Sequence, residues 1–170
     1  GKNSPWRYVV MFATILIATN TVGAIPLLIG YITKAASDPS IVHEIAENPN
    51  DLGVLGLDPN MGLFMMLFPF LIGLLTYIIL VKPLNNRTFK LTVNGTDTFR
   101  WNRFLVSALV WTILSAAYFF IYLKLDPSNF SLKNTSETLI PLIVISLIFF
   151  PFQAAFEEVL FRGYLMQGLA

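Results

Sequence analysis

Two adjacent carboxylates and an arginine follow a long apolar run near the end of this chain. They are Glu157, Glu158 and Arg162, in the stretch "FQAAFEEVLFRGYLMQ". Residues four apart share one face of a helix, so Glu158 can pair with Arg162, whereas Glu157 faces Gln153 and Phe161. About 100° of rotation separates the two carboxylates on an α-helix. The spacing therefore predicts two unequal glutamates, one neutralised by the arginine and one free.

Unequal surroundings would give these carboxylates different acid–base properties. We expect Glu158 to stay ionised with a lowered pKa, and the pKa of Glu157 to rise because it is desolvated beside a like charge. A carboxylate of that kind can act as a general base for water. The alternative is an ordinary ion pair at a helix end. Because the apolar pattern "VLFRGYLM" continues past Glu158, we expect embedded charges, and acids inside a membrane indicate function.

The composition predicts an integral membrane protein. Of the 170 residues, 55% are hydrophobic and 12% are charged, whereas ordinary soluble domains carry about 25% charged residues. The chain has no cysteine, which excludes disulfides, thiolate zinc sites and cysteine catalysis. No basic stripe is present, so no nucleic-acid partner is expected. The lipid bilayer is the expected surrounding.

The predicted fold class is all-α, a polytopic transmembrane helical bundle in a single domain, 1–170. A bilayer-spanning helix needs about 20 apolar residues, and four segments are long enough. The chain stops within an apolar pattern, so we expect it to be a piece of a longer protein. The predicted spans are 8–32, 61–81, 104–123 and 139–156, the last continuing as the motif helix to about 168.

Polar and small residues within the spans indicate packing. In the first span, Asn20 is expected to hydrogen-bond a neighbouring helix, and a place on a substrate path is the alternative. Pro69 is expected to kink the second span. The small residues of the third span predict a close-packing face. They are Ser107, Ala108, Ser115, Ala116 and Ala117.

The charges between the spans predict the orientation. The first loop, 33–60, is mainly acidic. The second loop, 82–103, is the most basic, which places it and the N-terminus in the cytoplasm. Its basic residues are Lys82, Arg87, Lys90, Arg100 and Arg103. Glu157 and Glu158 then lie toward the cytoplasmic end of the fourth span.

The stretch "FEEVLFRGYLMQ" resembles the first signature of the CPBP family of intramembrane proteases, which includes the CAAX prenyl endopeptidases of the Rce1 type and the Abi proteins. The family signature is Glu-Glu-x-x-x-Arg, matched by Glu157, Glu158 and Arg162. The stretches "RWNRF" and "FFPFQAAF" resemble bacterial members, so a bacterial cell membrane is the expected location. The resemblance implies a bundle of roughly eight spans around a buried proteolytic site.

The resemblance also implies roles for the three residues. Glu157 would activate the hydrolytic water, and Glu158 with Arg162 would orient the site. The family uses further motifs, Phe-x-x-x-His and a later histidine motif, and neither occurs in this chain, whose only histidine is His43. We therefore expect this piece alone to be inactive. No cofactor is expected, and a divalent metal stays open because the family has been described both as metalloproteases and as glutamic proteases.

Three functions remain after this reasoning. The first is an intramembrane endopeptidase acting on prenylated, leader or other membrane-associated peptides or proteins. The second is a non-proteolytic membrane protein of the same fold, such as a bacteriocin immunity or scaffold protein. The third is a transporter fragment in which Glu157 relays protons.

Overall fold

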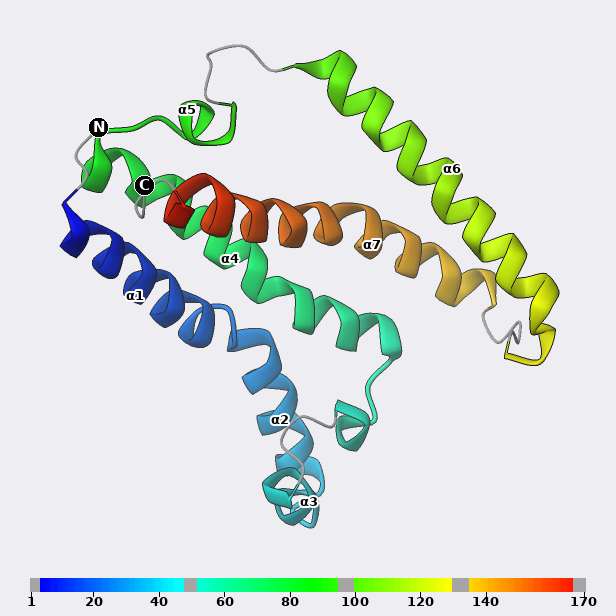
Figure 1. The fold of residues 1–170 in the computed structure, drawn as a ribbon. Coiled ribbons are helices and arrows are strands. Elements are labelled where there is room, and N and C mark those ends of the chain that lie inside the picture. Colours follow the sequence, from blue (N-terminus) through cyan, green and yellow to red (C-terminus); the bar gives the residue numbers. More distant parts are fainter. Residues whose placement is uncertain (1–3, 48–51, 95–99, 130–134, 167–170) are drawn as a thin grey trace.

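The computed structural model describes residues 4–47, 52–94, 100–129 and 135–166, and within these ranges it is helical with no strand. Figure 1 shows long helices joined by short ones. The elements are α1 (Pro5–Thr21), α2 (Ile25–Ser37), α3 (Ile41–Glu47), the 3-10 helix η1 (Leu52–Leu55), α4 (Pro59–Asn85), α5 (Phe89–Asn94), α6 (Trp101–Leu125), the 3-10 helix η2 (Pro127–Asn129), α7 (Ser136–Glu157) and the π-helix η3 (Glu158–Leu165).

Four helical segments of the described chain are long and apolar enough to cross a membrane, which confirms the predicted number of candidate spans. They comprise α1 with α2, α4, α6, and α7 with η3. Each begins before its predicted first residue, and the first three also end beyond their predicted last residue. The last two residues of the predicted motif helix, 167–168, lie outside the described residues.

The long helix α4 is the centre of the packed part and contacts both α1 and α7 (Figure 1). Asp58 begins it by accepting a hydrogen bond from the Asn60 amide at 2.8 Å, and Pro59 fits the first turn because no helical donor is needed there. The helix continues through Pro69. The main buried cluster joins α1, α4 and η3, and comprises Tyr8, Met11, Ile15, Tyr77, Val81, Val159, Leu160 and Tyr164.

Close contact at Gly73 holds three helices together. A Cβ atom on this residue would lie 2.6 Å from Phe156 Cε2 of α7 and 3.0 Å from Thr19 Cγ2 of α1. Atoms in van der Waals contact are normally about 3.5–4.0 Å apart, so only glycine fits. Gly73 therefore sets how closely α1 and α7 approach α4.

The first predicted span is a helix interrupted in its middle, which the hydrophobic pattern did not reveal. The α-helical pattern ends at Thr21 and resumes at Ile25. Gly23 lies in the interruption, where a Cβ atom would come within 2.8 Å of Pro69 Cα. The interruption thus packs directly against the backbone of α4.

The helix α6 differs from the other long helices because none of its residues is buried. It lies apart from them in Figure 1, and its main contacts are with the short η2. The predicted close-packing face meets no facing helix among the described residues, where all five of its small residues are exposed, so it stays a prediction. Small residues permit close approach, but they do not supply the facing helix.

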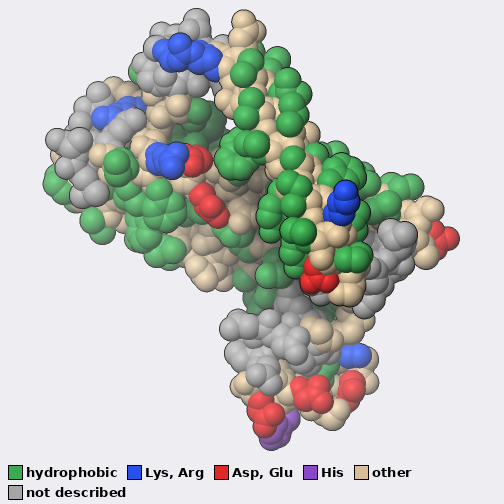
Figure 2. Space-filling view, turned by 45° about the vertical axis from the view of Figure 1, so that its right-hand side comes forward, with side chains coloured by type: hydrophobic (Ala, Val, Ile, Leu, Met, Phe, Trp, Pro, Cys, Tyr) green, Lys and Arg blue, Asp and Glu red, His purple; other side chains and the backbone are tan. Residues whose placement is uncertain are grey.

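Charged side chains are unevenly distributed over the surface. Figure 2 shows acidic side chains and the histidine at the end that carries α3, several basic side chains toward the opposite end, and further charges of both signs on the largely apolar surface between them. This distribution follows the division between the acidic first loop and the basic second loop.

Candidate functional site

The charged motif begins at the junction between two helix types. The α-helix α7 ends at Glu157, and the π-helix η3 begins at Glu158. π-helical turns inside longer helices are rare and frequently occur at functional sites. The sequence predicted a continuous helix here, and its spacing argument assumed α-helical geometry throughout. The structure therefore separates the two glutamates into two different helical geometries.

The predicted pair of Glu158 and Arg162 is confirmed. Arg162 Nη1 lies 3.3 Å from Glu158 Oε2. The Arg162 side chain is 79% exposed and the Glu158 side chain 59%, so an aqueous environment would screen their attraction strongly. The pair neutralises Glu158 and holds the arginine beside it.

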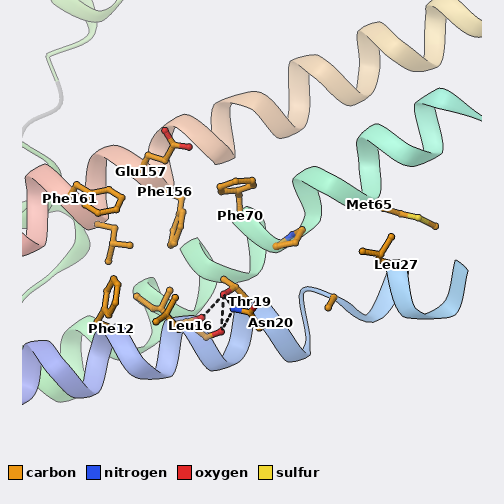
Figure 3. Close-up of a pocket in the computed structure, with 14 residues that line it drawn as sticks. Phe12, Leu16, Thr19, Asn20, Leu27, Met65, Phe70, Phe156, Glu157 and Phe161 are labelled. Atoms are coloured by element: carbon orange, nitrogen blue, oxygen red, sulfur yellow. Dashed lines mark hydrogen bonds between the residues drawn. The ribbon is translucent and has the colours of Figure 1, made fainter. Parts of the chain in front are cut away.

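The predicted separation of Glu157 from the arginine is also confirmed. Gln153 Nε2 donates to Glu157 Oε1 at 3.3 Å, across one turn of α7. The described residues leave Glu157 exposed rather than buried, so the protein part of the expected desolvation is missing here. In Figure 3 its carboxylate points away from α1. Glu157 thus occupies the rim of the cavity described next.

A cavity of about 540 Å³ lies between α1, α2, α4 and the junction of α7 with η3. Its walls are mostly apolar, and Phe70 and Phe156 form a T-shaped pair with their ring centroids 6.1 Å apart. Figure 3 shows α1 on one side and α7 on the other. Besides Glu157, the polar side chains in the lining are Thr19 and Asn20 of α1.

Among the described residues, Asn20 bonds only within its own helix, which differs from the preferred interpretation of its sequence position. Its Nδ2 donates to Leu16 O at 2.8 Å and lies 3.4 Å from Thr19 Oγ1, both within α1 (Figure 3). The side chain lines the cavity and is exposed. The structure therefore places this amide on a cavity wall.

A buried hydrogen-bond network fixes the position of η3. The Tyr164 hydroxyl donates to Asn85 Oδ1 at 3.0 Å and lies 3.4 Å from Arg7 O. Arg7 also donates to Leu84 O, which ties the start of α1 to the end of α4. Both Tyr164 and Asn85 have no exposed surface. Sequence reasoning missed this network because its members lie far apart in the chain, although an asparagine after an apolar run was a weak signal.

The short helix α5 packs against η3 from the side of the second loop. A Cβ atom on Gly163 would lie 3.2 Å from Thr92 Cγ2 and 3.3 Å from Thr92 O. This tight contact explains why a glycine follows Arg162. The loop therefore helps to position the segment that carries the charged pair.

The described residues contain no group of three or more histidine, cysteine, aspartate or glutamate side chains that could hold a metal ion. His43 lies on α3, where its Nδ1 is 3.3 Å from Glu47 Oε1. Glu157 and Glu158 are two carboxylates, and a stable metal centre ordinarily needs at least one further protein ligand. Within the described part of the chain, the site can offer a base and an ion pair.

Comparison with known proteins finds a similarity to the "Uncharacterized protein YyaK" of Bacillus subtilis (strain 168). The two sequences are 24% identical over 169 residues, which make up 99% of this chain and 54% of YyaK. The chain thus spans about half the length of this relative. No family model matches the chain, and no solved structure matches it. The function must therefore be argued from the site.

Proposed function

We propose that this chain is part of a polytopic membrane endopeptidase that resembles the CPBP family. The observation that carries the proposal is the difference between the two glutamates at the α7–η3 junction. Arg162 neutralises Glu158 at 3.3 Å, while Glu157 has no cationic partner among the described residues and borders an apolar cavity. Such a carboxylate is suited to general-base catalysis.

In the proposed reaction, Glu157 takes a proton from a water molecule as the water oxygen attacks a peptide carbonyl carbon. The carbon–nitrogen bond then breaks, and the departing amine receives the proton from Glu157. Glu158 and Arg162 are positioning residues, and Arg162 keeps the Glu158 carboxylate neutralised. In the bilayer, lipid and further protein would supply the desolvation that the described residues do not provide.

The proposal places the protein in a bacterial cell membrane with its N-terminus in the cytoplasm. The four long apolar helices support the membrane location, and the excess of basic residues in the second loop over the first supports the orientation. Glu157, Glu158 and Arg162 are all exposed, and we propose that further helices of the whole protein cover them. Those helices would carry the histidines that complete the site, since the family resemblance implies two such motifs.

The test is to identify new peptide termini in membranes that contain the full-length protein. Membranes with the wild type, Glu157→Gln and Glu137→Gln are incubated in ¹⁸O-labelled water, and peptides are analysed by mass spectrometry. We expect ¹⁸O in new carboxyl termini with the wild type and with the control Glu137→Gln, whose carboxylate lies in the first turn of α7. Loss of the base should reduce the signal by about 10²–10⁴-fold.

Two outcomes would contradict the proposal. Equal formation of labelled termini by Glu157→Gln and the wild type would exclude Glu157 as the base. Absence of labelled termini with every protein would instead favour a non-proteolytic membrane protein.

A further inference from the structure

Building on the proposed endopeptidase function, we propose that Asn20 and the helix interruption beside it bind the backbone of an extended substrate segment. The site would recognise peptide N–H groups, and the apolar walls would receive the neighbouring side chains. Asn20 is thus a positioning residue on the wall of the cavity opposite α7.

The first argument is the unused acceptor of Asn20. Its Nδ2 group is directed to Leu16 O, whereas its Oδ1 atom accepts no hydrogen bond from the described residues. The side chain is exposed to the cavity. The Oδ1 atom is therefore open to a donor from outside the described structure, and such a bond would be favoured in an apolar environment, where an unbonded carbonyl oxygen is costly.

The second argument is the backbone of the interruption. In a continuous α-helix, the Gly23 amide would donate to Thr19 O, but here it donates to Ala18 O at 3.0 Å. Thr19 O therefore loses its usual donor, and Thr19 also lines the cavity. Within a membrane, irregular backbone is tolerated where it is buried in protein or lines a water-filled cavity. Interrupted helices are also a recurring way to build binding sites at mid-membrane depth.

The chemistry selects an extended peptide as the ligand. Both Asn20 Oδ1 and Thr19 O are acceptors, so the ligand must provide donors. A helical segment keeps its own N–H groups bonded, whereas an extended segment presents them free. The aromatic and aliphatic walls, including Phe12, Leu16 and Phe70, suit the side chains of a membrane segment.

The test is disulfide cross-linking of a peptide to the full-length protein. The protein carries Glu157→Gln and a single introduced cysteine, with any other cysteine removed. The chain itself has none. The probes are two synthetic Leu/Ala peptides of about 20 residues with a central cysteine, one uninterrupted and one unwound by a central Gly-Pro pair. Ala24→Cys places the thiol on the cavity wall and leaves Asn20 intact. It should form a disulfide with the unwound peptide at least about tenfold more than with the helical one.

Thr14→Cys is the matched control. Thr14 lies on the same helix as Asn20 and donates to Val10 O at 2.8 Å, but it does not line the cavity. We expect weak and equal cross-linking of both peptides at this position. Equal cross-linking of both peptides by Ala24→Cys would overturn the proposal.

A second measurement tests the hydrogen bond itself. Asn20→Leu should weaken binding of the unwound peptide by about tenfold. N-methylation of the peptide group that meets Asn20 should weaken peptide binding to the protein with Asn20 intact. It should not weaken binding to Asn20→Leu any further, because the acceptor is already gone. Fully additive losses from N-methylation and Asn20→Leu would overturn the inference. The same measurements on the protein with Glu157 restored separate the two proposals. If the unwound peptide binds through Asn20 but is not cleaved, only the proposed endopeptidase function is contradicted. If the peptide is cleaved but N-methylation and Asn20→Leu act additively, only the proposed role of Asn20 is contradicted.

Discussion

The helices α4 and α6 have nearly the same apolar character but opposite surroundings. The most apolar 18-residue stretch has a mean hydropathy of 2.5 in α4 and 2.1 in α6. Yet 33% of this stretch is buried in α4 and none of it in α6. α4 carries Gly73, which lets α1 and α7 approach its backbone. α6 carries small residues as well, but no described helix buries them. Apolar composition predicts a membrane span, whereas burial depends on a complementary neighbour.

The largest expected effect would come from a charge in the middle of α6. If its exposed surface faces lipid, Ile113→Arg should disfavour membrane insertion by about 3 kcal/mol. Leu125→Arg, at the end of the helix, is the control, because an arginine there can reach the interface. The measurement is the inserted fraction of each variant in microsomes. Equal insertion would show that α6 does not occupy the bilayer centre.

The next effect concerns the packed centre. Gly73→Val should destabilise the protein by about 1–3 kcal/mol, because the new side chain would overlap Phe156 and Thr19. Ala108→Val on α6 adds similar bulk to an exposed surface and is expected to change stability by less than about 0.5 kcal/mol. Thermal unfolding in the same detergent compares the two variants. If both lower the midpoint equally, the contrast between α4 and α6 does not hold.

The buried network beneath the motif gives a third prediction. Tyr164→Phe removes the hydroxyl that donates to Asn85 Oδ1, and the loss of this buried hydrogen bond should cost about 0.5–1.5 kcal/mol. Tyr118→Phe serves as the control because Tyr118 is exposed on α6. Equilibrium unfolding should distinguish the two. A neutral Tyr164→Phe would mean that the network does not hold η3 in place.

The smallest expected effect on stability is that of the ion pair. Arg162→Lys retains the charge, and the exposed pair contributes at most about 1 kcal/mol, so unfolding should change little. Activity should respond more than stability, since lysine loses the planar fork that orients a carboxylate. Peptide-terminus formation and thermal unfolding are measured on the same preparation. Parallel losses in both would assign Arg162 a structural role only.

Local features of the motif were predictable because they depend on residues close in sequence. Four-residue spacing accounts for two contacts: the ion pair of Glu158 with Arg162, and the hydrogen bond of Glu157 with Gln153. The π-helical geometry of η3 was not predictable from that spacing. It coincides with packing against α5 and with the hydrogen bond from Tyr164 to Asn85, which are contacts between distant segments.

The interior of the first span illustrates the other limit. Asn20 stood out as a polar residue in an apolar helix, but its sequence position allowed either a bond to another helix or a place on a substrate path. The cavity wall on which its side chain lies depends on where the helix is interrupted and on Gly23 packing against Pro69. A hydropathy pattern contains neither fact, because it averages over the residues of one segment.

The sequence by itself determined the all-helical character, the four apolar segments and the unequal pair of glutamates, since each follows from composition or from spacing along one helix. Only the tertiary structure decided which helices pack together, where the first span is interrupted, and that Glu157 and Asn20 line one cavity. The physical reason is that packing depends on the shapes of two surfaces at once. A single segment specifies only one of them.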